Sequence, residues 1–318
     1  MPETIASLKS EFLRQVRDRW SHARPHNRKQ VVSTLSELFD RFREHGLDDP
    51  QFSQELASGN PHKHHQRLAE MLLAKYLWDN GFTLSSACEG PDFKASKGGI
   101  TVWIELVTPE PRGISPSWLL SGDNEGVWTY PHTEIALRYT SSLKEKFEKL
   151  TGIPKGQRGY LSKGIVGSNE PYVIAINQHL LQSNFRTLHG ISQTPTACEV
   201  LYSVGAIQLH LNRATGQTTH MDHAHRPSLE KTGSGGEKVA VPANSFLDPA
   251  YAPVSAVMAL DLQEEALISP DRAALKKEHL AAVIHNMGAR NAIPTRFLPG
   301  QEHWTAKTSA GSIELMKV

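Results

Sequence analysis

The sequence predicts an α/β protein whose central mixed sheet is flanked by helices and preceded by an N-terminal helical segment. Three observations support this fold class. Residues 61–80 have apolar side chains around most of a helix, residues 89–107 form a glycine-turned hairpin, and residues 171–177 form an apolar run of strand length. Between the hairpin and that run, residues 133–150 carry the apolar stripe of an amphipathic helix. The order helix, hairpin, helix, strand is that of an α/β core.

The totals exclude several classes of protein. In the 318 residues no apolar run approaches the roughly 20 residues that a membrane-spanning helix needs. The first residues lack the basic-then-apolar order of a signal peptide, so we expect a cytoplasmic protein. Two cysteines, Cys88 and Cys198, are too few for a disulfide framework or a thiolate zinc site. The net charge of +1 neither indicates nor excludes nucleic acid as a partner.

The chain is predicted to divide into four parts. Residues 1–58 are an N-terminal helical segment, because apolar residues recur every three or four positions on both sides of Pro25. Residues 59–180 are the α/β core. Residues 181–250 are an insertion with a hairpin, at 206–212 and 218–224, and a loose segment at 226–236. Residues 251–318 add a strand at 254–262, a helix at 271–286 and a closing pair of strands at 304–316, packed on the core.

Two charged residues stand on faces that are otherwise apolar. Glu70 lies within the apolar helix 61–80, where it is either neutralised by a nearby Arg or Lys or directed into a charged site. Lys146 falls on the apolar stripe of helix 133–150, so it must reach water or meet a carboxylate. Lys144 and Lys149 lie outside that stripe and are assigned to the solvent face.

The hairpin brings two further acids together. If Gly98 and Gly99 form a two-residue turn, paired positions sum to 197 and Asp92 lies opposite Glu105. Their Cβ atoms would then be roughly 5 Å apart on one face, and the charges would repel by about 3 kcal/mol at an effective dielectric near 20. A proton or a cation would relieve this repulsion. A hard divalent ion such as Mg²⁺ suits two carboxylates.

This layout resembles the PD-(D/E)xK nuclease superfamily, which has the restriction-endonuclease-like fold. The resemblance covers residues 64–177: Glu70 matches an acid on the first core helix, Asp92 follows a proline as in the first signature pair, and Glu105 matches the second acid. The resemblance implies a Mg²⁺- or Mn²⁺-dependent phosphodiesterase acting on nucleic acid. Asp92 and Glu105 would be metal ligands, and the Leu106 carbonyl an additional one. The ion would activate a water molecule and stabilise the charge on the phosphate.

The sequence departs from the family at one important position. Two residues after the second acid the family usually has lysine, but this chain has Val107. Some members of the superfamily carry this lysine on a neighbouring helix, and Lys146 is the candidate for that catalytic role, with Lys94 second. Lys94, Lys144 and Arg138 are predicted to contact nucleic acid, although Arg138 could instead stabilise Glu70.

Two alternatives remain open from the sequence. A nuclease fold without activity could bind nucleic acid or protein, which Val107 favours and the retained acid pair opposes. Histidines could instead form a Zn²⁺ or Ni²⁺ site, and a homo-oligomer is possible. The histidines concerned lie near the insertion hairpin and before the first core helix: His210, His220, His223, His225, His62, His64 and His65.

Overall fold

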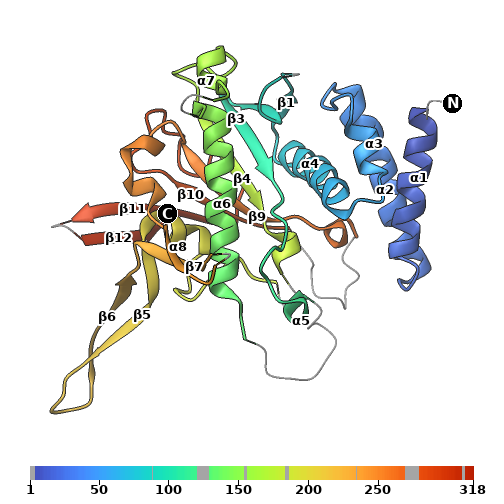
Figure 1. Cartoon of the computed structure of the whole chain (residues 1–318). Coiled ribbons are helices and arrows are strands. Elements are labelled where there is room, and N and C mark those ends of the chain that lie inside the picture. Colours follow the sequence, from blue (N-terminus) through green and yellow to red (C-terminus); the bar gives the residue numbers. More distant parts are fainter. Residues whose placement is uncertain are drawn as a thin grey trace.

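The protein is an α/β fold built on one eight-stranded mixed sheet, seen here in a computed structural model (Figure 1). The structure describes residues 4–87, 89–119, 129–153, 156–182, 186–233, 235–268, 279–309 and 312–318. The strands are ordered β1-β2-β3-β4-β9-β10-β11-β12 across the sheet. Their bounds are β1 Thr83–Ser85, β2 Phe93–Lys97, β3 Ile100–Val107, β4 Tyr172–Asn177, β9 Ala256–Asp261, β10 Leu280–His285, β11 Glu302–Ser309 and β12 Ser312–Lys317. The predicted fold class, a central mixed sheet flanked by helices, is confirmed.

Strand direction changes across the sheet. β1 is antiparallel to β2 and β2 to β3, whereas β3, β4 and β9 run parallel to one another. β10 is antiparallel to β9 and parallel to β11, and β12 closes the sheet antiparallel to β11. Every residue of β4 and β9 is buried, as expected for parallel strands covered on both faces. The carboxyl ends of β3, β4 and β9 therefore lie at the same edge of the sheet.

One face of the sheet is covered by the N-terminal helices. α1 (Ile5–Arg19), α2 (Pro25–Glu44) and α3 (Phe52–Leu56) lie outside α4 (Pro61–Asp79), which lies nearest the sheet (Figure 1). The Asn60 side chain accepts hydrogen bonds from the first free N–H groups of α4 and Pro61 occupies its first turn, a favourable helix start. Apolar side chains of α1, α2 and α3 join those of α4 and the inner residues of β2 and β3 in one core.

The opposite face is covered chiefly by α6 (His132–Thr151) and α8 (Thr196–Tyr202). The apolar stripe of α6, with Ile135, Tyr139 and Leu143, packs against β3 and β4 in a second core. Two short helices, α5 (Pro116–Leu119) and α7 (Tyr160–Lys163), lie before and after α6. α5 falls in the region between the hairpin and α6, and residues 120–128 of that region lie outside the described residues.

The insertion contains two hairpins. β5 (Val204–Leu211) and β6 (Thr218–His225) pair as predicted and project from the body of the molecule (Figure 1). β7 (Ser228–Thr232) then pairs with β8 (Lys238–Pro242). The expectation of a loose segment over residues 226–236 was therefore wrong for residues 228–232. Leu229 is buried against the second core, which holds this polar strand on the protein.

The predicted helix at residues 271–286 was also wrong in the part that the structure describes. Residues 269–278 lie outside the described residues, and residues 280–285 form β10. β10 pairs with β9 on one side and β11 on the other, and Ala281 to Ile284 are all buried. A short apolar run buried on both faces has no period that distinguishes a strand from a helix. Residues 280–285 form a strand because they pair with β9 and β11.

The described helices include none that is long and apolar enough to cross a membrane.

The layered core predicts a clear stability difference between two leucines. Leu72 of α4 is 1% exposed, whereas Leu211 of β5 is 57% exposed. We expect Leu72→Ala to lower the free energy of unfolding by about 2–5 kcal/mol, because it leaves a cavity between the helical layer and the sheet. Leu211→Ala, the matched control, should change it by less than about 0.5 kcal/mol. Urea unfolding followed by circular dichroism measures both. Equal effects of the two substitutions would contradict the packing described above.

Candidate active site

The β2–β3 hairpin has the register that the sequence predicts. Gly98 and Gly99 form the turn with φ of +55° and +78°, a conformation that glycine adopts without steric cost. Phe93, the first residue of β2, pairs with Ile104. The residue before it, Asp92, therefore lies beside Glu105. Strand pairing stops at Phe93, and the Leu106 N–H donates to Asp92 Oδ2 at 2.6 Å instead. Asp92 thus completes the hydrogen bonding of β3 where β2 begins.

Glu105 is the centre of the charged cluster. Its side chain is 2% exposed, and its Oε1 lies 3.1 Å from Lys146 Nζ and 3.0 Å from Lys149 Nζ. The Tyr160 hydroxyl of α7 donates to Oε2 at 3.3 Å. The sequence left open whether Lys146 reaches water or contacts a carboxylate. The structure shows that it contacts the Glu105 carboxylate. Lys149, assigned to the solvent face from the sequence, also reaches this carboxylate.

Glu70 reaches the same region from α4. Its carboxylate lies 3.0 Å from Arg67 Nη1 and accepts a hydrogen bond from Gln66 Nε2 at 3.1 Å. Gln66 also donates to the Leu106 carbonyl at 3.4 Å and accepts from the Thr108 N–H at 2.8 Å. These bonds join α4 to the carboxyl end of β3.

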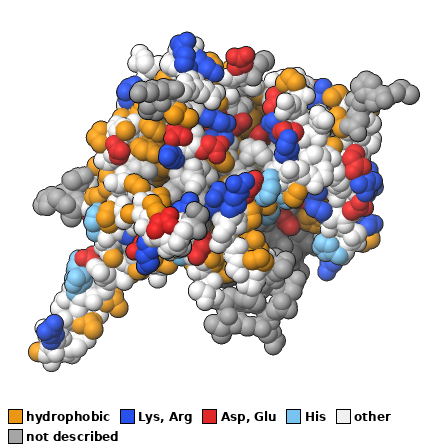
Figure 2. Space-filling model, viewed as in Figure 1, with side chains coloured by type: hydrophobic (Ala, Val, Ile, Leu, Met, Phe, Trp, Pro, Cys, Tyr) orange, Lys and Arg blue, Asp and Glu red, His pale blue; other side chains and the backbone are white. Residues whose placement is uncertain are grey.

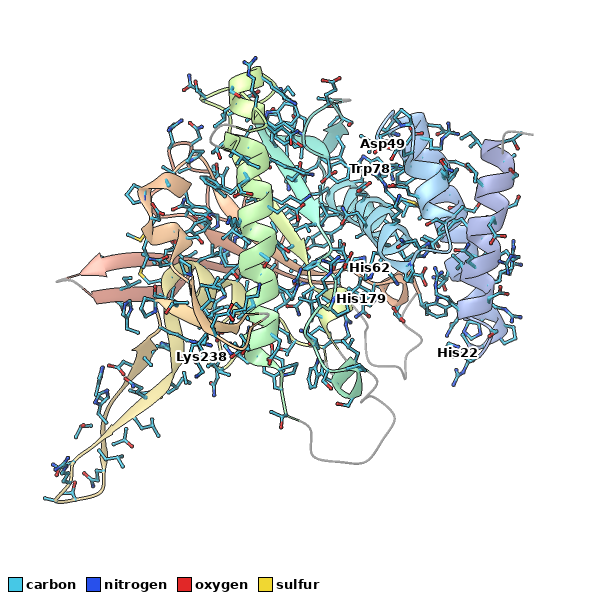
Figure 3. All side chains as sticks on the ribbon, in the orientation of Figure 1. His22, Asp49, His62, Trp78, His179 and Lys238 are labelled. Atoms are coloured by element: carbon cyan, nitrogen blue, oxygen red, sulfur yellow. The ribbon has the colours of Figure 1, made fainter. Side chains whose placement is uncertain are left out.

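Arg67, rather than Arg138, is the cation beside Glu70. It also pairs with Asp49 at 2.8 Å and with Glu55 at 2.8 Å, so it binds α4 to the N-terminal segment. Asp49 is labelled in Figure 3, where it lies beside the N-terminal helices. An arginine therefore balances the charge of Glu70, and the charge of Glu70 also raises the pKa of Asp92. A role for Glu70 in a functional site stays a prediction.

The pKa shifts show that neighbouring carboxylates oppose the ionisation of Asp92. Burial raises the pKa of Asp92 well above its usual value, and the charges of Glu105 and Glu70 raise it further. Burial also raises the pKa of Glu70, against the opposing effect of Arg67. Burial alone would lower the pKa of Lys146, but Glu105 and Asp92 outweigh it and raise that pKa. Lys146 is therefore held as a cation beside these acids.

The remaining predicted residues lie around this cluster rather than in it. Val107 is buried and joins the apolar core beneath α6, so no strand cation accompanies Glu105. The Lys94 ammonium lies 3.0 Å from Glu170 and 4.7 Å from the centre of the Trp103 ring. Lys144 is exposed on α6, 3.8 Å from Glu148.

Arg138 is half-buried, and burial lowers its pKa, with a further decrease from Arg112. The described residues show no hydrogen bond or ion pair between Arg138 and Glu70, and its Nε is buried without a hydrogen-bond partner. The expected support of Glu70 by Arg138 is thus supplied by Arg67. The possible contacts of Lys94, Arg138 and Lys144 with nucleic acid stay predictions.

Four residues of the cluster were missed by sequence reasoning: Gln66, Arg67, Lys149 and Tyr160. Gln66 and Arg67 precede Glu70 by four and three positions, and Lys149 follows Lys146 by three. Residues three or four positions apart are neighbours on a helix surface. The spacing could therefore have identified Gln66 and Arg67 as neighbours of Glu70, and Lys149 as a neighbour of Lys146. Tyr160 enters from beyond α6, and its place depends on the tertiary structure.

The donor atoms at this site suit a hard divalent cation. Asp92, Glu105 and the Leu106 carbonyl offer the oxygen ligands that Mg²⁺ and Mn²⁺ prefer. Across the described ranges, no three side chains of His, Cys, Asp or Glu are placed to hold a metal ion together, and this applies to the acid cluster too. Mg²⁺, however, is commonly held by one or two carboxylates, with water and substrate phosphate completing its coordination. A cation held between the two carboxylates would relieve the repulsion by which Glu105 raises the pKa of Asp92.

Comparisons with known proteins add no family to this description. No protein-family model, no curated protein and no solved structure matches the chain.

The raised pKa of Asp92 predicts a specific pH dependence of stability. Above the ordinary aspartate pKa near 3.9 the unfolded chain loses this proton while the folded protein keeps it. Stability should therefore fall as pH rises toward the folded pKa of Asp92, by up to about 1.4 kcal/mol per pH unit. Asp92→Asn lacks this proton but can still accept the Leu106 N–H. The free energy of unfolding of Asp92→Asn, relative to that of the wild type, should therefore rise between pH 4 and pH 7. Urea unfolding at each pH measures this difference. Parallel profiles for the two proteins would show that Asp92 ionises normally.

Proposed function

We propose that the chain is a Mg²⁺- or Mn²⁺-dependent nuclease-like protein that hydrolyses phosphodiester bonds in nucleic acid. The observation that carries this proposal is the contact of Lys146 with Glu105 beside Asp92. Two acids and a buried lysine are the groups that the resemblance to PD-(D/E)xK nucleases requires. Here the lysine comes from α6 instead of the strand position that Val107 occupies. The order α4, β2–β3 hairpin, α6 and β4 also agrees with the layout on which the resemblance rests.

Each residue of the cluster has a role in this proposal. Asp92, Glu105 and the Leu106 carbonyl would hold the metal ion, which when bound supplies a Lewis acid and lowers the pKa of water. Glu70 adds negative charge that attracts the ion to Asp92 and Glu105. Lys146 is fixed as a cation by Glu105, so it can orient the attacking water and stabilise charge developing on the phosphate.

The partly exposed edge of the cluster suits an anionic polymer. The Lys149 side chain is 45% exposed although it contacts the buried Glu105, and Lys144 lies in the preceding turn of α6. Cations on one helix beside the acid cluster can neutralise backbone phosphates. Tyr160 adds a hydroxyl donor on the same side, since it also binds Glu105.

One observation favours a second candidate, a nuclease fold without activity that binds nucleic acid. Both lysines approach the same Glu105 oxygen, so they already compensate the carboxylate that would ligate a metal. If they stay there, the site is neutral without an ion and serves as a binding surface. The experiment below separates this candidate from the first.

Lys146→Met provides the sharpest test of the catalytic proposal. Hydrolysis of single- and double-stranded DNA and RNA in Mn²⁺ should fall by 10²-fold or more, because one buried cation that stabilises the transition state is removed. Lys238→Met, at an exposed lysine of β8 that pairs with Glu230, is the control matched for residue type and should retain most of the activity. Asp92→Asn and Glu105→Gln should lose both Mn²⁺ binding, measured by calorimetry, and cleavage.

The outcomes distinguish the candidates. Nucleic-acid binding without cleavage of any of the four substrates would favour the silent module, whether or not Mn²⁺ binds. Wild-type protein that binds no Mn²⁺ would remove the basis for the nuclease proposal. Equal activity of the Lys146 and Lys238 variants would show that Lys146 only neutralises Glu105.

A further inference from the structure

The β5–β6 hairpin, here called the arm, has two chemically different faces. Leu209 and Met221 are directly opposed on one face, and both are about 60% exposed. His210 and His220 are directly opposed on the other face, with Asp222 on the same side. Figure 2 shows the arm extending from the body with hydrophobic and histidine side chains on its surface.

We propose that His210, His220 and Asp222 form a binding site for a divalent transition metal ion of the zinc class. His210 Nε2 lies 3.0 Å from one Asp222 oxygen, and His220 Nε2 lies 3.5 Å from the other. With metal–ligand bonds of 2.0–2.2 Å, two ligands of a tetrahedral ion are about 3.3 Å apart. The observed separations lie on either side of that value.

The separation of the two imidazole rings fits the same ion. Their centres are 5.5 Å apart. Two imidazoles bound to one tetrahedral zinc ion would have centres about 5 Å apart, from the bond length to each nitrogen and the size of the ring. Imidazole nitrogen with a carboxylate oxygen is a donor set that suits zinc, copper or nickel better than Mg²⁺. The arm site therefore differs in metal preference from the oxygen-rich site at Asp92 and Glu105.

Binding requires a small rotation of exposed side chains. As placed, no three His, Cys, Asp or Glu side chains in the described part of the chain hold an ion together, and here the two imidazoles approach different oxygens of Asp222. The His210, His220 and Asp222 side chains are 51%, 65% and 43% exposed, and exposed side chains change rotamer readily. The strand register already fixes their backbone positions. The ion has only to replace the hydrogen bond between His210 and Asp222 and the longer contact between His220 and Asp222.

The arm would be stabilised by such an ion. β5 and β6 form a two-stranded sheet of their own, and a two-stranded hairpin is marginally stable in water. Near its base, His223 Nε2 binds the Ser192 carbonyl at 3.0 Å and anchors the arm to the body. Farther out, His210 and His220 face each other close to the turn at residues 212–217. A shared ion there would join the two strands near the turn.

Zinc titration of the full chain by calorimetry tests this site. We expect one Zn²⁺ ion to bind the arm, with affinity reduced at least about 10-fold in His210→Ala, His220→Ala and Asp222→Asn. His62→Ala is the control matched for residue type, since His62 lies on α4 far from the arm (Figure 3). It should bind as the wild type does, and so should Asp92→Asn, because the proposed nuclease site is separate.

Limited proteolysis gives a second readout that does not depend on affinity alone. Zn²⁺ should slow cleavage at the turn of the wild-type arm by several-fold and have no effect on the His210→Ala and His220→Ala proteins. Zn²⁺ affinity unchanged by substitution of both histidines would overturn the proposal. Loss of Zn²⁺ binding in Asp92→Asn or His62→Ala would also overturn it, because the ion would then be bound elsewhere.

Discussion

The ion pair between Lys146 and Glu105 is the interaction on which the charged site depends. Their side chains are 8% and 2% exposed and lie 3.1 Å apart, between α6 and β3. Each charge alone would be costly at this depth, and removing one partner of such a pair typically costs several kcal/mol. The pair therefore fixes the position of α6 along the sheet. Because α6 also carries Lys149, it determines which cations reach the acid cluster.

Backbone hydrogen bonding explains why the acids gather at this point. β2 begins one residue after Asp92, so the Leu106 N–H has no strand partner and binds the Asp92 carboxylate. Gln66 binds the Leu106 carbonyl and the Thr108 N–H in the same way from α4. Backbone groups at the end of a strand need partners, and side chains from two other elements supply them. The carboxyl ends of parallel strands are where open α/β sheets commonly bind ligands.

Local pattern predicted the parts of the fold and site that depend on short-range geometry. The glycine turn and the alternation of strand residues determined the register that brings Asp92 to Glu105, and helical spacing placed Lys146 on the buried stripe of α6. The contact between Lys146 and Glu105 joins different elements, so the sequence left it open. The same limit explains β10: residues 280–285 are a strand because β9 and β11, which are separated from them in the sequence, pair with them. β7 instead pairs with β8 in a local hairpin, which the polar residues 226–236 did not indicate. Tyr160 reaches the site only through the packing of α7 on α6.

In the acid cluster, the protonation state that makes the metal-free protein most stable opposes the proposed metal binding. A metal ligand must be deprotonated, yet burial and two neighbouring acids raise the pKa of Asp92 well above its usual value. The metal-free protein is therefore most stable with a proton where the ion would bind, and an ion must displace that proton. Lys146 and Lys149 reduce the negative charge by pairing with Glu105, but the same contacts compete with the ion for this carboxylate. Lys149 is partly exposed and can turn toward solvent or a phosphate, whereas Lys146 is buried and cannot. Lys146 is thus the cation that stays beside the acids, and Lys149 is the one whose movement can make Glu105 available.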